Sequence, residues 1–190
     1  MLRNFFNYLT DSFNCFYLNY KHAQIGKDSH FYGKTCFSIF NGANISIGNN
    51  FISRSGFGNH ILGGGVTNIQ VQRKATLRIG NNSGIACTAI LCDHNITIGN
   101  FVNIGAGSII MDTNFHSLDW EKRGNRAVDK DKSPQSVVIG DYAFIGAKAI
   151  ITKGVTIGCK SIVAAGSVVV KNIPPNEMWG GNPAKFIKKI

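Results

Sequence analysis

The chain has 190 residues and a mass of 20.6 kDa, which suits one domain, and 44% of its residues are hydrophobic, enough to fill a core. Its 22 glycines argue against a helix bundle, while the 4 prolines and the charged fraction of 16% argue against collagen and disordered chains. The formal charge of +10 predicts attraction to anions such as phosphorylated cofactors, nucleic acid or anionic lipid.

The first predicted element is an amphipathic helix over residues 3–20. Apolar side chains recur there at steps of three and four residues, at Leu2, Phe6, Leu9, Phe13, Phe16 and Tyr20. Because the end of a repeat domain must be covered, we expect this stripe to pack on the first coil or on a neighbouring subunit. Peripheral membrane contact through residues 3–20 is the alternative; the aromatic side chains favour it, and the scarcity of basic residues, Arg3 and Lys21, disfavours it.

The main feature of the sequence is a six-residue repeat near its C-terminal end. Apolar residues recur every six positions, at Ile139, Ile145, Ile151, Ile157, Val163 and Val169, and the second and fifth positions of these hexads are mostly small. This period fits neither an α-helix nor a half-buried strand. It fits a β-solenoid in which three short strands make one coil of 18 residues and every lead residue points to one interior.

The same repeat runs upstream with defects. Its leads in the two preceding coils are Ile98, Ile104 and Ile110, and Ile79, Ile85 and Leu91. Ile79 and Ile98 are 19 residues apart instead of 18, so we expect one residue to bulge near Asp93 to Asn95. The register between Phe37 and Ile69 is loose. The sequence predicts about seven stacked coils.

The hexads stop after Phe115 and resume at Val138. The charged segment 116–137 between them predicts a loop ejected from the solenoid, and loops this long are usually functional; a disordered decoration is the alternative. The predicted organisation is therefore a helical segment at 1–24, the repeat domain with its ejected loop at 25–175, and a tail with a short helix at 176–190.

The sequence shows neither a cysteine pairing pattern nor a targeting segment. The five cysteines are odd in number and none is paired as C-x-x-C, which favours buried thiols over disulfides or a zinc site, so no metal is expected. No apolar stretch is long enough to span a membrane, and the N-terminus lacks signal-peptide features. We therefore expect a cytoplasmic protein.

The hexads, together with the ending I-P-P-N-E-M-W-G-G-N-P-A-K-F-I-K-K-I, closely resemble the hexapeptide-repeat acyltransferases, and among them the galactoside, maltose, nodulation and surface-polysaccharide O-acetyltransferases. The resemblance implies an all-β, left-handed parallel β-helix that assembles as a homotrimer with active sites between neighbouring prisms. It also implies acetyl-CoA as acyl donor and a saccharide hydroxyl as acceptor, such as one on a surface polysaccharide or a lipid-linked glycan intermediate.

The resemblance further implies catalytic groups. His116, in M-D-T-N-F-H-S-L-D at the start of the ejected loop, matches the family's catalytic histidine. An imidazole, with an ordinary pKa of ~6.5, suits a base that removes the proton of an attacking hydroxyl. The backbone N–H of Ala147 matches the donor to the oxyanion of the tetrahedral intermediate. A plain surface histidine is the alternative for His116.

Substrate-binding residues follow from the same resemblance. Asp93, in L-C-D-H-N, matches an acidic position that contacts acceptor hydroxyls, and an Asx turn that stabilises the bulge is the alternative. Thr88 stands where those relatives carry an acceptor-binding Asn, which leaves the acceptor's identity open. Phe144 replaces the aromatic residue of the family's I-G-x-x-x-W pattern.

For the cofactor, small residues are expected to line the cleft taken by the pantetheine arm: Gly146, Ala147, Ala164 and Ala165. Lys171 and Lys185 match basic positions of the family and would bind the phosphates of CoA. Solubilising surface lysines are the alternative for both.

Some other functions are compatible with the sequence, and others are not. An N-acetyltransferase of an amino sugar and a non-catalytic β-helix scaffold stay open, and the scaffold would not need His116. The γ-type carbonic anhydrases share the prism but need an H-x-x-x-x-H pair beside a third histidine, which this sequence lacks. Nucleic-acid binding is disfavoured because no recognised module is present. The remaining histidines are expected at the surface or in the core: His22, His30, His60 and His94.

Overall fold

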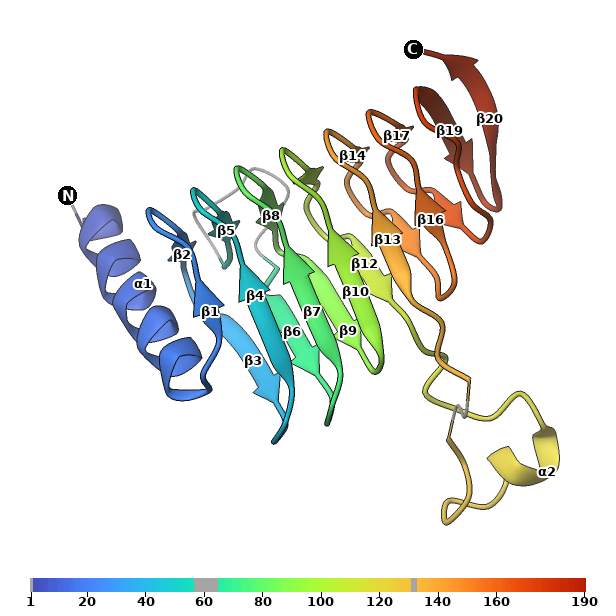
Figure 1. Ribbon diagram of the computed structural model, residues 1–190, viewed down its shortest axis with the longest axis horizontal. Helices are drawn as coiled ribbons and strands as arrows, with labels where there is room; N and C mark the ends of the chain where they lie inside the picture. The colour runs from blue at the N-terminus through green and yellow to red at the C-terminus, as the bar shows by residue number, and fades with distance from the viewer. Residues whose placement is uncertain (1, 57–64, 131–132) are drawn as a thin grey trace.

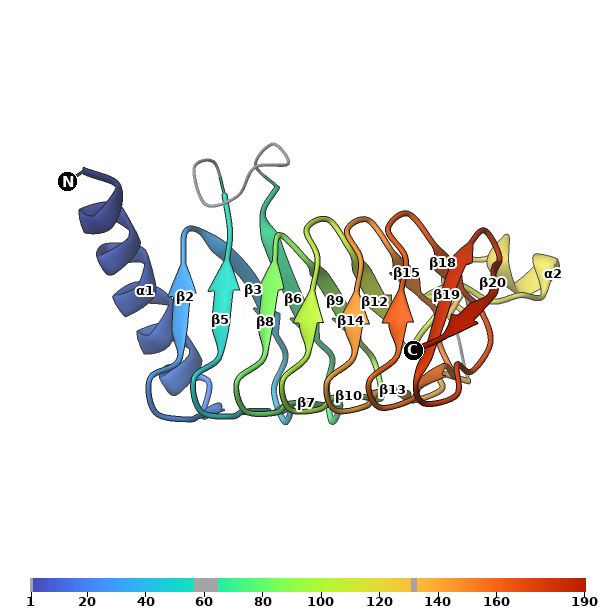
Figure 2. The same cartoon turned by 90° about the horizontal axis from the view of Figure 1, so that it is seen from above.

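The computed structural model describes residues 2–56, 65–130 and 133–190, so that His60 lies outside the described residues. In these ranges the chain winds into a triangular prism of six complete coils (Figures 1 and 2). A bridge between Ile157 and Ile173 starts a seventh coil. Each complete coil contributes one strand to each of three sheets, as expected for a parallel β-helix of about seven coils.

The strands form three sheets, A, B and C, one on each face of the prism. Sheet A contains β1 (Gln24–Ile25), β4 (Asn44–Ile47), β7 (Thr76–Ile79), β10 (Asn95–Ile98), β13 (Val137–Ile139) and β16 (Thr156–Ile157). Sheet B contains β2 (His30–Tyr32), β5 (Ile52–Arg54), β8 (Gly84–Ala86), β11 (Asn103–Ile104), β14 (Phe144–Ile145), β17 (Ile162–Val163), β19 (Glu177–Gly181) and β20 (Ala184–Lys189). Sheet C contains β3 (Thr35–Ile39), β6 (Thr67–Val71), β9 (Ala89–Cys92), β12 (Ile109–Met111), β15 (Ile150–Ile151) and β18 (Val168–Val169). Neighbours pair in parallel, apart from β19 with β20.

The hexad leads form the core. Ile139 is 1% exposed and lies in register with Ile98 of the preceding coil and Ile157 of the following one. Burying such a side chain fully contributes about 1.5–3 kcal/mol relative to leaving it exposed. Because each lead stacks on the next, the coils stabilise one another, and the interior predicted from the period is confirmed.

A ladder of side chains closes the corner between sheets A and B. The Oδ1 atoms of Asn49, Asn81, Asn100 and Asp141 each accept a backbone N–H from the preceding coil at 2.8–2.9 Å. A Cβ added to Gly99 would lie 2.8 Å from the backbone nitrogen of Asp141, so glycine is needed beside this ladder. The recurring Ile-Gly-Asn and Ile-Gly-Asp triplets thus encode both the core and the corner.

The expected register is wrong in the third coil. Ile90 is fully buried and pairs with Ile110, whereas the expected lead, Leu91, is only half-buried. The turn from Ile85 to Ile90 is one residue shorter than a regular hexad, and the following bend at Asp93–His94 takes up the extra length. The bulge therefore lies where it was expected, but the residue that enters the core differs.

The predicted N-terminal helix is α1 (Leu2–Tyr20), which lies across the first coil at the end of the prism (Figure 1). Polar side chains face the prism: the Asn14 amide donates to two backbone oxygens of the first coil at 3.0 Å, and Asp11 accepts the N–H of Phe31 at 2.5 Å. Leu18 is a buried apolar residue of the helix. The expected packing of the apolar stripe on the first coil is wrong, because an edge strand such as β2 presents backbone groups that need hydrogen-bond partners.

The short helix expected within residues 176–190 is also wrong. This segment forms the antiparallel hairpin β19–β20, and β19 extends sheet B by pairing with β17. Pro183 and the adjoining glycines are poor helix formers. Gly181 has a φ of 101°, a conformation that favours glycine, so the tail turns back as a hairpin.

The segment predicted to be ejected leaves sheet C after β12 and rejoins the prism at β13, whose first residue, Val137, lies inside the range expected for the loop. Within it, α2 (Trp120–Arg123) is a single helical turn. The carboxylate of Asp119 caps this turn by accepting the N–H groups of Glu121 and Lys122. The described part of this excursion thus contains a short, capped helix.

Candidate active site

His116 is held by a carboxylate that the sequence analysis did not single out. Its Nδ1 lies 2.7 Å from Oδ2 of Asp129, and the Ser117 N–H donates to the other oxygen of Asp129 at 2.9 Å. The Ser117 N–H and the His116 ring lower the pKa of Asp129 from its usual value of 3.8. Asp129 is therefore ionised at neutral pH and fixes the orientation of the imidazole.

The second ring nitrogen of His116 is left for another molecule. The side chain of His116 is 68% exposed, whereas that of Asp129 is only 12% exposed. When Nδ1–H donates a hydrogen bond to the carboxylate, the neutral ring carries its lone pair on Nε2. His116 can then accept a proton from a hydroxyl group that approaches the outer side of the loop.

Backbone contacts inside the ejected segment hold this pair in place. Arg123 Nη1 donates to the carbonyl oxygen of Ser117 at 2.9 Å, and the Asp129 N–H donates to the carbonyl oxygen of Asn125, also at 2.9 Å. Phe115, directly before His116, has a φ of 60°. These hydrogen bonds hold the part of the loop around His116 in place. The charge pattern of the sequence alone could not have revealed which acidic residue pairs with His116.

A buried carboxylate connects the base of this loop to the bulge that carries Asp93. Asp112 has no exposed surface and accepts the N–H groups of Asp93 at 2.7 Å, His94 at 2.9 Å and Asn95 at 2.7 Å. Asp112 directly follows β12 and precedes His116 by four residues. Asp93 and His116 therefore belong to the same corner of the prism, between sheets C and A, and Asp93 is half-buried there.

Thr88 is placed differently from the expectation. It lies in the turn after β8 with no exposed surface, and its hydroxyl donates to the carbonyl oxygen of Ala86 at 3.0 Å. A side chain without exposed surface offers no contact to an acceptor. The hydroxyl of Thr88 instead stabilises this turn through its hydrogen bond.

The small residues predicted to line the cofactor cleft gather at the corner between sheets B and C. Gly146–Ala147 and Ala164–Ala165 occupy equivalent turns in successive coils, and a Cβ added to Gly146 would lie 2.5 Å from the nitrogen of Ala165. Among the described residues, no acceptor pairs with the N–H groups of Ala147 and Ala165, while the N–H of Gly146 is bonded to Val163. Unpaired amides at a turn can bind a carbonyl oxygen or an oxyanion.

The two lysines predicted to bind phosphates lie apart. Lys185 is exposed on β20, opposite Gly180 of β19, and so belongs to the sheet that leads to the Ala164 turn. Lys171 is exposed after β18, at the corner between sheets C and A. Within one protomer, the predicted anion site is therefore split.

The predicted residues consequently form two groups at opposite edges of sheet C. His116 and Asp93 lie at the corner with sheet A, and Ala147 and Ala165 lie at the corner with sheet B. One side of the prism is about six residues long, so at ~3.3 Å per residue the two corners are on the order of 15–20 Å apart. A single protomer does not bring the candidate base and the candidate oxyanion donor together.

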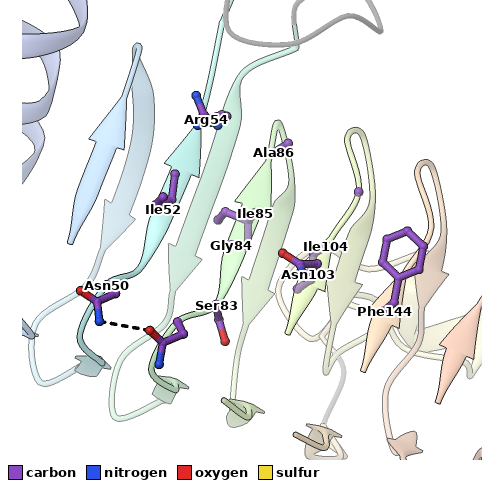
Figure 3. Close-up of a pocket in the computed structure, with 12 residues that line it drawn as sticks. Asn50, Ile52, Arg54, Ser83, Gly84, Ile85, Ala86, Asn103, Ile104 and Phe144 are labelled. Carbon is purple, nitrogen blue, oxygen red and sulfur yellow. Dashed lines mark hydrogen bonds between the residues drawn. The ribbon is translucent and has the colours of Figure 1, made fainter. Parts of the chain in front are cut away.

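A depression of about 310 Å³ lies on the outer face of sheet B (Figure 3). Gly84, Ala86 and Asn103 line it between Arg54 on one side and Phe144 on the other. Phe144, which replaces the family's aromatic residue, is partly exposed here. The other predicted site residues do not line this depression, so it is separate from both corner groups.

The buried cysteines supply no ionised thiol to either group. Burial raises the pKa of Cys92 to about 12 and that of Cys15 to about 11, so both remain thiols at neutral pH. Cys36 and Cys159 are exposed. In the ranges that the structure describes, no three His, Cys, Asp or Glu side chains are grouped as a metal site requires.

Comparisons with known proteins support the identification of a hexapeptide repeat. A family model described as the hexapeptide repeat of succinyl-transferase matches residues 136–171. Among curated proteins, the chain is similar to the galactoside O-acetyltransferase of Escherichia coli (strain K12), with 36% identity over 101 residues, which are 53% of this chain and 47% of that protein. The chain spans about half the length of the curated relatives it matches.

The similarity to solved structures covers most of the chain. A hexapeptide-repeat acetyltransferase from Vibrio cholerae has a TM-score of 0.56 and 28% identity, covering 87% of this chain and 73% of that one, and it was also solved with acetyl coenzyme A. AntD, an N-acyltransferase from Bacillus cereus solved with an amino-sugar nucleotide and coenzyme A, shares the fold, with a TM-score of 0.67, 22% identity and coverage of 87% and 82%. The chain therefore has the left-handed β-helix fold, and it is similar to galactoside O-acetyltransferase and to hexapeptide-repeat acetyltransferases.

Proposed function

We propose that this protein is an acetyl-CoA-dependent O-acetyltransferase that acetylates a hydroxyl of a saccharide. The observation that carries the proposal is the exposed imidazole of His116, whose Nδ1 is held by the shielded carboxylate of Asp129. The relatives support the chemistry, since one is a galactoside O-acetyltransferase and another was solved with acetyl coenzyme A. A hydroxyl on a surface polysaccharide or a lipid-linked glycan intermediate, modified in the cytoplasm, is the acceptor we favour.

In this mechanism His116 acts as general base. Its Nε2 accepts the hydroxyl proton as the acceptor oxygen attacks the thioester carbonyl, and Asp129 stabilises the imidazolium that forms. The oxyanion of the tetrahedral intermediate accepts the N–H of Ala147. When the C–S bond breaks, His116 returns the proton to the leaving sulfur, so that the products are an acetyl ester and free coenzyme A.

The corner between sheets B and C suits a thin amide-containing chain. Gly146 and Ala164 keep the surface low, and beside the Ala147 N–H, which faces the oxyanion, the unpaired N–H of Ala165 can donate to a carbonyl oxygen of the pantetheine arm. Lys185 adds a positive charge on the same sheet for a phosphate. These residues fit coenzyme A without a metal ligand or a nucleophilic cysteine.

Because His116 and Ala147 lie at opposite edges of sheet C, we further propose that the site is completed by a second copy of the chain. A cyclic homotrimer of parallel prisms would bring the His116 corner of one protomer against the Ala147 corner of the next, giving three equivalent sites. Lys171, which lies at the His116 corner, would then approach the cofactor bound to the neighbouring protomer.

The proposal is tested by measuring thiol release from acetyl-CoA with a panel of mono- and oligosaccharides. We expect His116→Ala to lower turnover by at least ~10²-fold, because general-base catalysis typically contributes ~10²–10⁴-fold, with little change in acetyl-CoA affinity. His22→Asn, at an exposed histidine in the turn after α1, is the matched control and should keep wild-type turnover. Wild-type turnover in His116→Ala would remove His116 from the mechanism.

The same panel separates the competing functions. Release only with amino sugars carrying a free amine would identify an N-acetyltransferase. Absence of release with every acceptor, together with absence of acetyl-CoA binding, would identify a scaffold.

A further inference from the structure

The apolar stripe of α1 faces away from the prism. Seven large apolar or aromatic side chains of the helix are between 49% and 71% exposed: Phe5, Phe6, Tyr8, Leu9, Phe13, Phe16 and Tyr20. Exposed apolar residues are common singly, but a contiguous set along one helix marks an interaction site. Figures 1 and 2 show that no other described element covers this side of α1.

The orientation of the helix is fixed by specific bonds. Asp11 accepts the N–H of Phe31 and binds Nδ1 of His30 at 2.8 Å, and the Thr10 hydroxyl accepts the N–H of Gly33 at 3.0 Å. With the Asn14 amide, these contacts satisfy backbone groups of the first coil. The helix cannot turn its apolar stripe inward without breaking them, so the outward orientation is built into the fold.

The charge around the stripe has one sign. Asp11 is the single acidic residue of α1, and its carboxylate is engaged with His30 and Phe31 on the inner side. Lys34 borders the stripe, where it lines an apolar hollow of about 440 Å³ together with Phe6, Leu9 and Phe13. Lys21 lies at the C-terminal end of the helix, 5.9 Å from the ring centre of Tyr20.

We infer that this end of the protein docks on the surface of an anionic lipid bilayer, with the stripe of α1 inserted at the level of the headgroups. Aromatic and aliphatic side chains on one helical face, flanked by lysines, are the chemistry that such an interface binds. No helix in the described ranges is long and apolar enough to cross the bilayer, so the contact is peripheral.

A second copy of the chain is the less suitable occupant. Residues 1–92 contain eight Lys and Arg but only two Asp and no Glu, so two prisms stacked end to end through their α1 stripes would place like charges opposite each other. Anionic lipid complements this charge. The helix also covers the terminal face of an elongated prism, and such a face can approach a plane without obstruction from the coils (Figure 2).

The test is co-sedimentation of the full-length protein with vesicles of phosphatidylcholine alone and of phosphatidylcholine with one quarter phosphatidylglycerol. We expect binding to the anionic vesicles that weakens at high salt, and a loss on the order of tenfold or more in Phe13→Gln/Phe16→Gln. These two side chains are 67% and 71% exposed, so the variant should keep the wild-type melting temperature and circular dichroism spectrum. Phe186→Gln, at a half-exposed aromatic of β20 at the opposite end of the prism, is the matched control and should bind like wild type.

Two results would overturn the inference. One is absence of vesicle binding by the wild-type protein, or equal binding by Phe13→Gln/Phe16→Gln in its folded state. The other is a concentration-dependent doubling of the native mass that disappears in this variant, because a second copy would then cover the stripe. Neither result bears on thiol release from acetyl-CoA, so the acetyltransferase proposal is judged separately.

Discussion

At the scale of single residues, the proposed chemistry depends on how the imidazole of His116 is held. Asp129 lies 13 positions downstream in the ejected segment and reaches Nδ1 of His116 and the N–H of Ser117 with its two oxygens. The contact to Ser117 holds the carboxylate against the backbone from which His116 projects. Asp129 is therefore a positioning residue that acts through His116 and keeps Nε2 turned outward.

Replacing this carboxylate should slow turnover more than it weakens substrate binding. We expect Asp129→Asn to lower kcat by about 10–10³-fold, since the amide no longer stabilises the imidazolium, while KM for acetyl-CoA stays within about twofold. Steady-state kinetics of thiol release measure both quantities. Asp119→Asn, in the same loop and able to keep the cap of α2, should leave them unchanged. A rise in KM without a fall in kcat would contradict the positioning role.

The pH dependence follows from the lowered pKa of Asp129. Because this carboxyl has its pKa below its usual value of 3.8 in the folded protein, its stabilising contacts are present above about pH 4 and are lost as the pH falls through the lowered value. The difference in melting temperature between wild type and Asp129→Asn should therefore be present at pH 5 and above and shrink below pH 4. A difference that vanishes near neutral pH would show that Asp129 is not ionised as described.

At the scale of the elements, the strength of the repeat decided what the sequence could predict. The hexads from Ile139 onward predicted the strands and core directly, because each lead residue stacks on an equivalent one. The same reasoning placed Leu91 inward incorrectly, since a shortened turn is invisible to a period. It also missed the orientation of α1, because the hydrogen-bonding needs of an edge strand outweighed the pattern of apolar residues.

Prediction of the candidate site from the sequence was limited in the same way. His116 could be proposed from the point where the hexads stop and from the resemblance of its motif. Asp129 could not, because it lies in a segment without periodicity, where only the folded loop decides which acid meets the histidine. Thr88 was placed by analogy alone, and its burial came from the turn that surrounds it.

The element that joins the bulge to the loop should be sensitive to one substitution. Asp112 satisfies three backbone N–H groups, and the single amide oxygen of an Asn cannot replace two carboxylate oxygens. We expect Asp112→Asn to lower the free energy of unfolding by about 1–3 kcal/mol, measured by urea denaturation. Asp28→Asn, at an exposed aspartate whose φ of 54° suits Asn, should change it little. Equal stability of Asp112→Asn and wild type would show that these bonds are not needed to hold the bulge.

At the scale of the whole molecule, different parts of the prism carry different candidate functional surfaces. One end carries the apolar stripe of α1, and the sides carry two groups of candidate residues separated by the width of sheet C. In the proposed mechanism, this division requires a neighbouring copy of the chain to complete the site. The central claim is therefore that acetyl transfer takes place between protomers, with His116 from one and the Ala147 corner from the next.

Complementation between two inactive variants tests this claim most directly. His116→Ala removes the base, and Ala165→Trp fills the cofactor corner with an indole at a position where the side chain is exposed. If each site combines the two corners from different protomers, co-expression in equal amounts should restore thiol release to about one quarter of the wild-type level, because random assembly makes about a quarter of the sites intact. Activity that stays as low in the mixed assemblies as in either variant alone, while wild type is active, would contradict a shared site.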